Sequence, residues 1–469
     1  MKYDFKENIH TDSIIGEVFA ANEFLCEVIG LSHHKVGAMI LFESNSIGFI
    51  QKITEEYSTV VLITNLGVMP GETALLYRDD IEIPVGDKFL GRVIDVFGNP
   101  IDQKGKIESE YSSPIFRPSY PIIERDSIVK QIETGIILVD SLFPLAYGQR
   151  EVILGGMKTG KTTFLKELIA NQSTDVIVIY VLIGKKADEV DDIVSYFEEN
   201  KVLSHTVVVY APATSLPSIQ YLSAYSGCSM GEYFWEKGKD VIVVYDDLTT
   251  HAKSYREISL VSGISPGRDS YPADIFSIHS KLIERSGRTA RFKGSMSALP
   301  VVSIQNNDLT GYISTNIMSM TDGHLFFDTE SYLKGIRPAI NSYISVSRIG
   351  KRVQDSVMKE IADDLNLALI KYQDSEKLAH FETSLSSNIL DNLYLGDKIY
   401  ALFRQEIGER FTLFEEKVLL SLVLYTPSNT LNVEDIPYAK KRVKELSKIE
   451  NFRKENLTDN IIKFLVPAK

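Results

Sequence analysis

The chain has 469 residues, with 50 lysines and arginines against 63 aspartates and glutamates, which gives a formal net charge of −13. This length predicts about two to four domains. The composition, with 44% hydrophobic and 24% charged residues, excludes a disordered or fibrous protein. The acidic balance argues against a protein that binds nucleic acid through its overall charge.

The same sequence predicts a soluble chain in a reducing compartment. The start, MKYDFKENIHTD, has no apolar core of the kind found in signal peptides. No apolar run reaches the ~18 residues that a membrane span needs. The two cysteines, Cys26 and Cys228, form neither a metal-binding spacing nor a disulfide framework. We therefore expect a cytoplasmic protein.

Residues 14–79 read as a series of short strands separated by Gly, Asn, His or Ser. Five strand segments stand out: IIGEVFA, FLCEVIG, GAMILFE, SIGFIQKI and STVVLIT. Strands that are short and regularly spaced are typical of a small barrel. The sequence therefore predicts an N-terminal β-barrel domain over residues 1–80.

Alternating strands and helices follow Gln149. Buried strands are predicted at 175–184, 205–211 and 240–247, with helices between them at 187–200 and 217–236. Helices of this length make right-handed crossovers between parallel strands. We expect an α/β domain of the P-loop, RecA-like type over residues 81–354.

The last part of the chain has helical spacing in the segments VMKEIADDLNLALIKYQ and EEKVLLSLVLY. Glycine also becomes rare there. A C-terminal helical bundle is predicted over residues 355–469. The expected architecture is thus a multidomain protein with a barrel, an α/β nucleotide-binding domain and a helical bundle.

One motif carries a clear chemistry. It fits the pattern G-x-x-x-x-G-K-[ST], follows a predicted strand and opens a predicted helix, and it consists of Gly155, Gly156, Met157, Lys158, Thr159, Gly160, Lys161 and Thr162. The backbone N–H groups of such a loop cradle phosphate oxygens, and the lysine contacts the β- and γ-phosphates. The motif predicts binding of ATP or ADP.

A strand-end carboxylate completes the expected site. In the segment Ile242–Asp246, Asp246 ends a buried strand, where a carboxylate can hold Mg²⁺ through water while the Thr162 hydroxyl ligates the ion. Asp247 is more simply explained as a solvated residue or a helix cap.

The motifs together resemble the α subunit of rotary F-type ATPases (ATP synthases). The resemblance lies in RPSYPIIERDSIVKQIETGIILVDSLFPLAYGQREVILGGMKTGKT, AYSGCSMGEYF, IVVYDDLT, PGRDSYPADIFSIHSKLIERS, SMTDGHLF and GIRPAINSYISVSRIG. It runs from about residue 14 to 360 and weakens after 400. The divergent chain is also similar to the F-type-like ATPases of wall-less bacteria.

The resemblance implies a subunit that binds nucleotide without turning it over. Hydrolysis needs a carboxylate to activate water, and catalytic paralogues carry a glutamate after the glycine that follows Ile183. This sequence has Gly184-Lys185, where α subunits usually have glutamine, and a charged lysine cannot accept a proton. Asp188 and Glu189 are more simply read as helix N-terminal acids than as substitute bases. Gly156 and Lys158 replace the family's usual Asp and Gln.

Other residues receive roles only through the resemblance. Arg337-Pro338 matches the family's adenine-pocket pair, and Gln405 matches a C-terminal adenine contact. Arg348 matches the arginine that reaches into the neighbouring β site, which makes it a catalytic residue acting in trans. Ser319 is placed near that shared site.

The leading hypothesis is therefore a non-catalytic, regulatory α-type subunit in an ATP-hydrolysing or ATP-synthesising complex. Its partners would be β-type catalytic subunits in an alternating heterohexamer, a central γ-type shaft, and a membrane sector or other machinery, which places the complex at the inner face of the cell membrane. Coupling could be to proton transport or to another mechanical process such as gliding. Two alternatives are a homohexameric secretion or export ATPase, against which Lys185 argues, and an RNA-translocating, helicase-like ring, which needs basic grooves with stacking aromatics.

Overall fold

The computed structural model describes residues 4–10, 13–305, 307–379, 386–427, 430–446 and 459–467. The remaining positions of the expected barrel and helical regions lie outside the described residues. The chain forms two compact units, one from residues 1–127, 174–303 and 309–321, the other from residues 128–173, 304–308 and 322–469. The boundaries of the three expected domains stay predictions. Within the described ranges, no helix combines the length and the apolar character needed to cross a bilayer.

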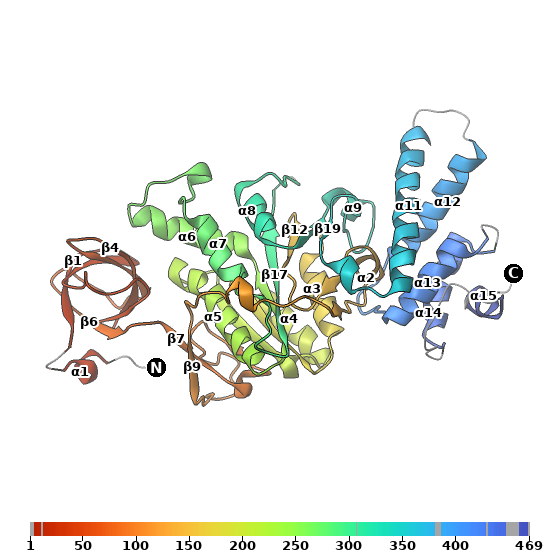
Figure 1. Ribbon diagram of the computed structural model, residues 1–469. Coiled ribbons are helices and arrows are strands. Elements are labelled where there is room, and N and C mark those ends of the chain that lie inside the picture. The colour runs from red at the N-terminus through yellow and green to blue at the C-terminus, as the bar shows by residue number, and fades with distance from the viewer. Residues whose placement is uncertain are drawn as a thin grey trace. The chain divides into compact units, whose positions relative to one another are not determined.

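The N-terminal strands of the first unit form the expected closed barrel (Figure 1). After the short helix α1 (Phe5–Asn8), its strands follow the order β1-β2-β5-β4-β3-β6 around the barrel. Their bounds are Ile15–Ala21, Leu25–Ile29, Met39–Phe42, Ile47–Ile53, Ser58–Thr64 and Thr73–Arg78 for β1 to β6. The sequence predicts five of these strands. The sixth, β6, closes the barrel by pairing with β1 and β3.

The first unit also contains a parallel sheet. Its strand order is β17-β15-β13-β14-β8, with bounds Ser295–Ser303, Asp240–Asp246, Val176–Lys185, Thr206–Pro212 and Val93–Ile94. Every residue of β13 from Val176 to Ile183 is buried, as expected for a strand covered on both faces. The helices of this unit are α4 (Ala187–Glu199), α5 (Pro217–Glu236), α6 (Leu248–Val261), α7 (Ile275–Ile283) and α8 (Tyr312–Met320).

Smaller elements connect these parts of the first unit. The two-stranded sheet of β7 (Glu82–Val85) and β9 (Tyr111–Pro114) follows the barrel, and β16 (Gly287–Arg288) pairs with β17. The 3₁₀ turns are η1 (Asp87–Phe89), η2 (Ile122–Glu124), η3 (Leu203–His205) and η4 (Arg268–Ser270).

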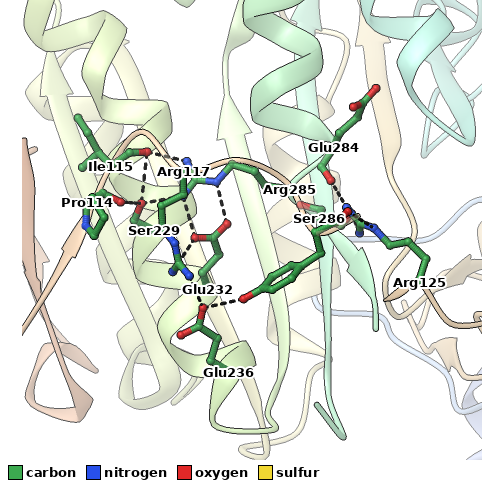
Figure 2. A network of polar contacts seen from close by, with 11 residues as sticks. Pro114, Ile115, Arg117, Arg125, Ser229, Glu232, Glu236, Glu284, Arg285 and Ser286 are labelled. Carbon is green, nitrogen blue, oxygen red and sulfur yellow. Dashed lines mark hydrogen bonds and ion pairs between the residues drawn. The ribbon is translucent and has the colours of Figure 1, made fainter. Parts of the chain in front are cut away.

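A buried ion-pair network ties the segment after β9 to α5 and to the end of α7 (Figure 2). The Arg285 side chain has no exposed surface and donates from Nε and Nη2 to the two carboxylate oxygens of Glu232, at 2.7 and 2.8 Å. Its Nη1 donates to the Ile115 carbonyl at 2.7 Å. Arg117 adds a contact to Glu232 at 3.1 Å and another to Glu236 at 2.7 Å. The network fixes three segments that are distant in sequence.

The second unit contains β12 (Glu151–Gly155) in parallel pairing with β18 (Gly323–Phe327), which in turn pairs with β19 (Val346–Ser347). The helix α3 (Lys161–Ala170) follows β12. Shorter elements are β10 (Gln131–Ile132), β11 (Leu145–Ala146), α2 (Ile137–Leu142), α9 (Thr329–Leu333) and α10 (Gly350–Val353).

The C-terminal part of the second unit is helical, as the sequence predicts. The long helices α11 (Ser356–Ala379) and α12 (Ser387–Phe403) lie side by side (Figure 1). They are followed by α13 (Leu413–Tyr425), η5 (Val433–Asp435), α14 (Ile436–Val443) and α15 (Asp459–Leu465). The α13 helix is closed at its start by a capping box of Thr412 and Glu415.

Candidate functional site

The phosphate loop lies between β12 and α3, as predicted. Gly155 ends the strand, and a Cβ added there would lie 2.6 Å from Phe327 Cβ. Gly160, at φ +97°, immediately precedes the helix and has no side chain to cap it. The loop therefore needs glycine at position 155 because there is no space for a side chain, and at position 160 because of the backbone conformation. The first turn of α3 presents its N–H groups and its positive dipole end at this loop, which suits an anion.

The side chains of the loop close back on its own backbone. Lys161 Nζ donates to the carbonyls of Gly155 and Gly156, at 2.8 and 2.5 Å. Thr159 Oγ1 donates to the Gly156 carbonyl at 2.9 Å. Lys158 is exposed at φ +61°, and Met157 beside it is 82% exposed. Thr162 is half-buried in the first turn of α3.

A polar wall beside the loop was not anticipated from the sequence. Thr329 Oγ1 donates to Asn307 Oδ1 at 3.0 Å, and Asn307 Nδ2 donates to Asp328 Oδ1 at 3.0 Å. A Cβ on Gly156 would come within 3.2 Å of Thr329 Oγ1. The glycine that replaces the family's usual aspartate therefore lies close against this wall. The sequence signal for it was the Asp-Thr pair that follows β18 and opens α9.

The segments around Arg337 and Gln405, which the resemblance assigns to the adenine base, lie in contact in the second unit. The Gln405 backbone N–H donates to the Arg337 carbonyl at 2.9 Å, next to the cis Arg337–Pro338 bond. The Gln405 side chain is held by protein backbone: Nε2 donates to the Gly135 carbonyl at 2.9 Å, and Oε1 accepts from Ile137 N–H at 2.8 Å.

The Arg337 side chain is also held by contacts within the protein. Its guanidinium lies 3.7 Å from the centroid of the Tyr332 ring and donates to the Tyr332 carbonyl at 2.8 Å. In this arrangement Arg337 and Gln405 fix the shape of the two loops. Contact of either side chain with adenine stays a prediction.

In the first unit, Asp246 at the end of β15 is paired with Lys185. By the resemblance, Lys185 stands where catalytic paralogues carry a glutamate. Lys185 Nζ lies 2.8 Å from Asp246 Oδ1, and the Tyr180 hydroxyl donates to Asp246 Oδ2 at 3.2 Å. Burial raises the pKa of Asp246 and the lysine opposes this shift, while the same carboxylate raises the pKa of Lys185 in spite of its burial. The short distance and the tyrosine donor favour an ionised pair.

The neighbouring acids take structural roles. Asp247 is the N-cap of α6, accepting from Thr250 N–H at 2.7 Å, and its other oxygen accepts from Ser303 Oγ at 2.9 Å. This confirms the interpretation of Asp247 as a cap. Asp188 and Glu189 lie in the first turn of α4, where negative charge is favourable.

The two residues assigned to a shared site lie in different units. Arg348 is exposed in the second unit, where its backbone N–H donates to the Asp322 carbonyl at 3.0 Å. Its guanidinium forms no hydrogen bond or ion pair with any residue that the structure describes, and its charge acts to lower the pKa of the buried Glu151 and of His324. Ser319, on α8 in the first unit, donates its hydroxyl to the Asn316 carbonyl at 2.6 Å. Arg348 is thus available for a contact outside the chain.

A glycine-rich turn between a parallel strand and a helix, with the lysine at the helix start, defines a P-loop nucleotide-binding protein. Residues 135–347 match the nucleotide-binding domain of the ATP synthase alpha/beta family, and residues 354–463 match the C-terminal domain of ATP synthase alpha/beta chains. The chain belongs to the ATP synthase alpha/beta family.

Its relatives indicate the alpha type within that family. ATP synthase subunit alpha of Caldanaerobacter subterraneus subsp. tengcongensis is 37% identical over 437 residues, covering 92% of this chain and 86% of the relative. ATP synthase subunit alpha of Carsonella ruddii is 32% identical over 476 residues, covering 97% and 98%. ATP synthase subunit alpha 2 of Legionella pneumophila is 38% identical, covering 87% and 82%. The chain is an alpha-type subunit of an F-type ATPase.

Proposed function

We propose that this chain is the non-catalytic, nucleotide-binding subunit of an alternating heterohexameric ATPase. It holds ATP or ADP at its own phosphate loop and supplies Arg348 to the catalytic site of an adjacent β-type subunit. The observation that carries the proposal is the ion pair at 2.8 Å between Lys185 and Asp246. A lysine bound in this way cannot act as the base that hydrolysis requires.

The intact phosphate loop and the exposed Arg348 support the two halves of this role. The loop has the glycines, the lysine and the helix start that phosphate binding needs. Arg348 carries a permanent charge and a planar set of N–H donors. An arginine of this form stabilises the negative charge on the phosphoryl oxygens in the transition state. Nucleotide turnover would then occur in the partner, and the complex would turn a central shaft at the inner face of the membrane.

The isolated chain is expected to bind ATP and to hydrolyse it well below ~1 s⁻¹, the lower end of usual enzyme turnover. Equilibrium binding of a fluorescent ATP analogue and a steady-state phosphate-release assay measure the two properties on the same preparation. Lys161→Ala should weaken binding, because the lysine is the charge placed at the start of α3. Lys166→Ala, farther along the same helix, is the matched control and should bind normally. Turnover at or above that rate from the pure chain would refute the non-catalytic role.

Co-purification tests the assembly directly. A tagged chain expressed in its own cells should retain a β-type partner, identified by mass spectrometry, with a glutamate after the glycine at the end of the strand that follows its phosphate loop. Recovery of a ring made only of this chain would contradict the heterohexamer.

The segment Gly263–Tyr271 is expected to contact the central shaft. It is a stiff turn, with Gly267 N–H donating to the Tyr271 carbonyl at 2.8 Å, and Ser265 and Ser270 are exposed on it. Cys26 and Cys228 are buried, so cysteines introduced as Ser265→Cys or Ser270→Cys would be the reactive thiols. Within the purified complex they should crosslink to a coiled-coil subunit, whereas the exposed control Ser204→Cys should not. Crosslinks only to stalk or membrane proteins would exclude this placement.

A further inference from the structure

Within the second unit, the turn at residues 133–135 links the phosphate-loop helix to the loop that carries Gln405. The Gly135 carbonyl accepts from Gln405 Nε2 at 2.9 Å. The Glu133 carbonyl accepts from Gln172 Nε2 at 3.0 Å, just beyond the end of α3. The position of this turn therefore bears on both sides of the expected nucleotide site.

A buried carboxylate, that of Asp140 in α2, holds this turn. It accepts from Thr134 N–H and from the Thr134 hydroxyl, both at 2.9 Å, and from Gly135 N–H at 3.0 Å. Hydrogen bonds of this kind favour the ionised acid. Burial raises the pKa of Asp140, and these donors limit it to about 7.

A second buried acid, Glu416 in α13, meets Asp140 there. Both side chains are 0% exposed, and the Glu416 carboxyl makes a hydrogen-bonding contact with the Asp140 carboxyl. Among the described residues, no N–H or hydroxyl group donates to either oxygen of Glu416. Two carboxyl groups form a hydrogen bond only when one of them keeps its proton. Since Asp140 has its donors and Glu416 has none, the proton belongs on Glu416.

The surroundings of Glu416 also disfavour its ionised form. Burial raises its pKa well above the usual range, and the negative charges of Asp140, Glu133 and Glu415 act in the same direction. The basic side chains on the adjoining segments have partners of their own: Arg410 with Glu167, Lys417 with Asp355, Lys440 with Glu409, and Lys398 with the Tyr394 ring.

We propose that Glu416 keeps its proton and donates a hydrogen bond to Asp140, and that this acid pair positions the Gln405 loop of the nucleotide site through the turn at residues 133–135. The inference rests on the proposed function, in which this chain binds nucleotide at its own phosphate loop. Glu416 is a positioning residue, because it acts on the site through Asp140 and the turn. When the pair loses its proton, two negative charges repel each other in the buried contact between α2 and α13.

The direction of the pH dependence follows from the raised pKa of Glu416. The folded chain holds a proton that the unfolded chain releases above the ordinary glutamate pKa of about 4.3. The stability that the pair contributes is therefore fully present below that pH and is lost as the pH rises through the raised pKa. One proton changes the folding equilibrium by at most about tenfold per pH unit.

The test measures the urea midpoint of the full chain and its affinity for a fluorescent ATP analogue from about pH 7 to about pH 9. In the wild type both should fall as the pH rises, the affinity by at least about threefold. Glu416→Gln supplies an N–H to Asp140 but has no proton to lose. Its affinity should change by less than about twofold, and its midpoint should fall less than that of the wild type. A Glu416→Gln chain that fails to fold, or that keeps the wild-type pH dependence, would overturn the proposal.

Two further variants locate the proton. Glu415→Gln, one residue away in the same helix, is the matched control: glutamine also serves in a capping box, so the pH dependence should stay that of the wild type. Asp140→Asn would turn an amide N–H toward the N–H donors of the turn, and its affinity should be lower at every pH by more than about tenfold. A tolerated Asp140→Asn beside a damaging Glu416→Gln would contradict the assignment of the proton to Glu416.

The two measurements separate the acid pair from the nucleotide site. If Glu416→Gln removes the pH dependence of the midpoint while the affinity keeps it, the positioning role is wrong. If the wild type binds no nucleotide at any pH, the proposed function fails and the positioning role with it, whereas the urea midpoints still decide whether Glu416 carries the proton.

Discussion

Replacement of Arg348 by alanine should lower the ATPase rate of the assembled complex by about 10³–10⁵-fold, the range over which arginine fingers act. The transferred phosphoryl group spreads negative charge over its oxygens, and a desolvated guanidinium stabilises that charge in the transition state. Within the described part of the chain, Arg348 is exposed and its guanidinium has no hydrogen-bond or ion-pair partner. Steady-state ATPase assays on complexes of verified stoichiometry measure the effect.

Two further variants distinguish a loss of transition-state stabilisation from a failure of the complex to assemble. Arg348→Lys should rescue poorly, because an ammonium lacks the planar fork of the guanidinium. Arg352→Ala, four residues on and also exposed, should change the rate only mildly. Nucleotide binding by the isolated Arg348→Ala chain should stay normal. A fully assembled Arg348→Ala complex with a rate within a few-fold of wild type would disprove the assignment.

Replacement of Glu232 by glutamine should destabilise the first unit by about 3–5 kcal/mol, because it leaves the buried Arg285 guanidinium without its counter-charge. The Arg285 and Glu232 side chains are 0% and 2% exposed, and they share two hydrogen bonds. Figure 2 shows that Arg117 also points at Glu232, so the substitution removes a carboxylate from two arginines at once. The shift of the urea midpoint, followed by circular dichroism, measures the loss.

Glu236→Gln is the matched control on the same helix. Glu236 contacts Arg117 at 2.7 Å, but these two side chains are 34% and 28% exposed, so its removal should cost about 1 kcal/mol or less. Arg285→Met combined with Glu232→Leu should recover much of the stability, since well-packed apolar residues can replace a buried ion pair. Equal midpoint shifts for Glu232→Gln and Glu236→Gln would show that burial of the pair is not what stabilises this region.

The elements most faithfully predicted were those with a strong local signal. The apolar run of β13 was expected at 175–184 and lies at Val176–Lys185, and α5 was expected at 217–236 and lies at Pro217–Glu236. The phosphate loop was recognised because its glycines and lysine have to occupy fixed positions. The sixth barrel strand was missed because TALLYR has a weak alternating pattern, although at six residues it is longer than β2 and β3.

The side-chain contacts between distant segments of the site could not be predicted from the sequence in this way. Arg337 and Gln405 were assigned to adenine, but nothing in their local sequence showed that the Gln405 side chain would be held by Gly135 and Ile137. The pairing of Lys185 with Asp246 did leave a signal. Both residues end strands that are neighbours in a parallel sheet, so their side chains meet at the same edge.

That pairing also constrains the evolutionary paths open to this chain. By the resemblance to catalytic paralogues, a return to hydrolysis needs a glutamate at position 185. Lys185→Glu alone would place a third carboxylate beside Asp246 and Asp247 while removing the cation that neutralises them, and an uncompensated buried charge is strongly destabilising. A change at Asp246 alone would leave the lysine unpaired. Either of these two single changes therefore leaves one charge without its partner, so the pair opposes a one-step return to the glutamate of the catalytic paralogues.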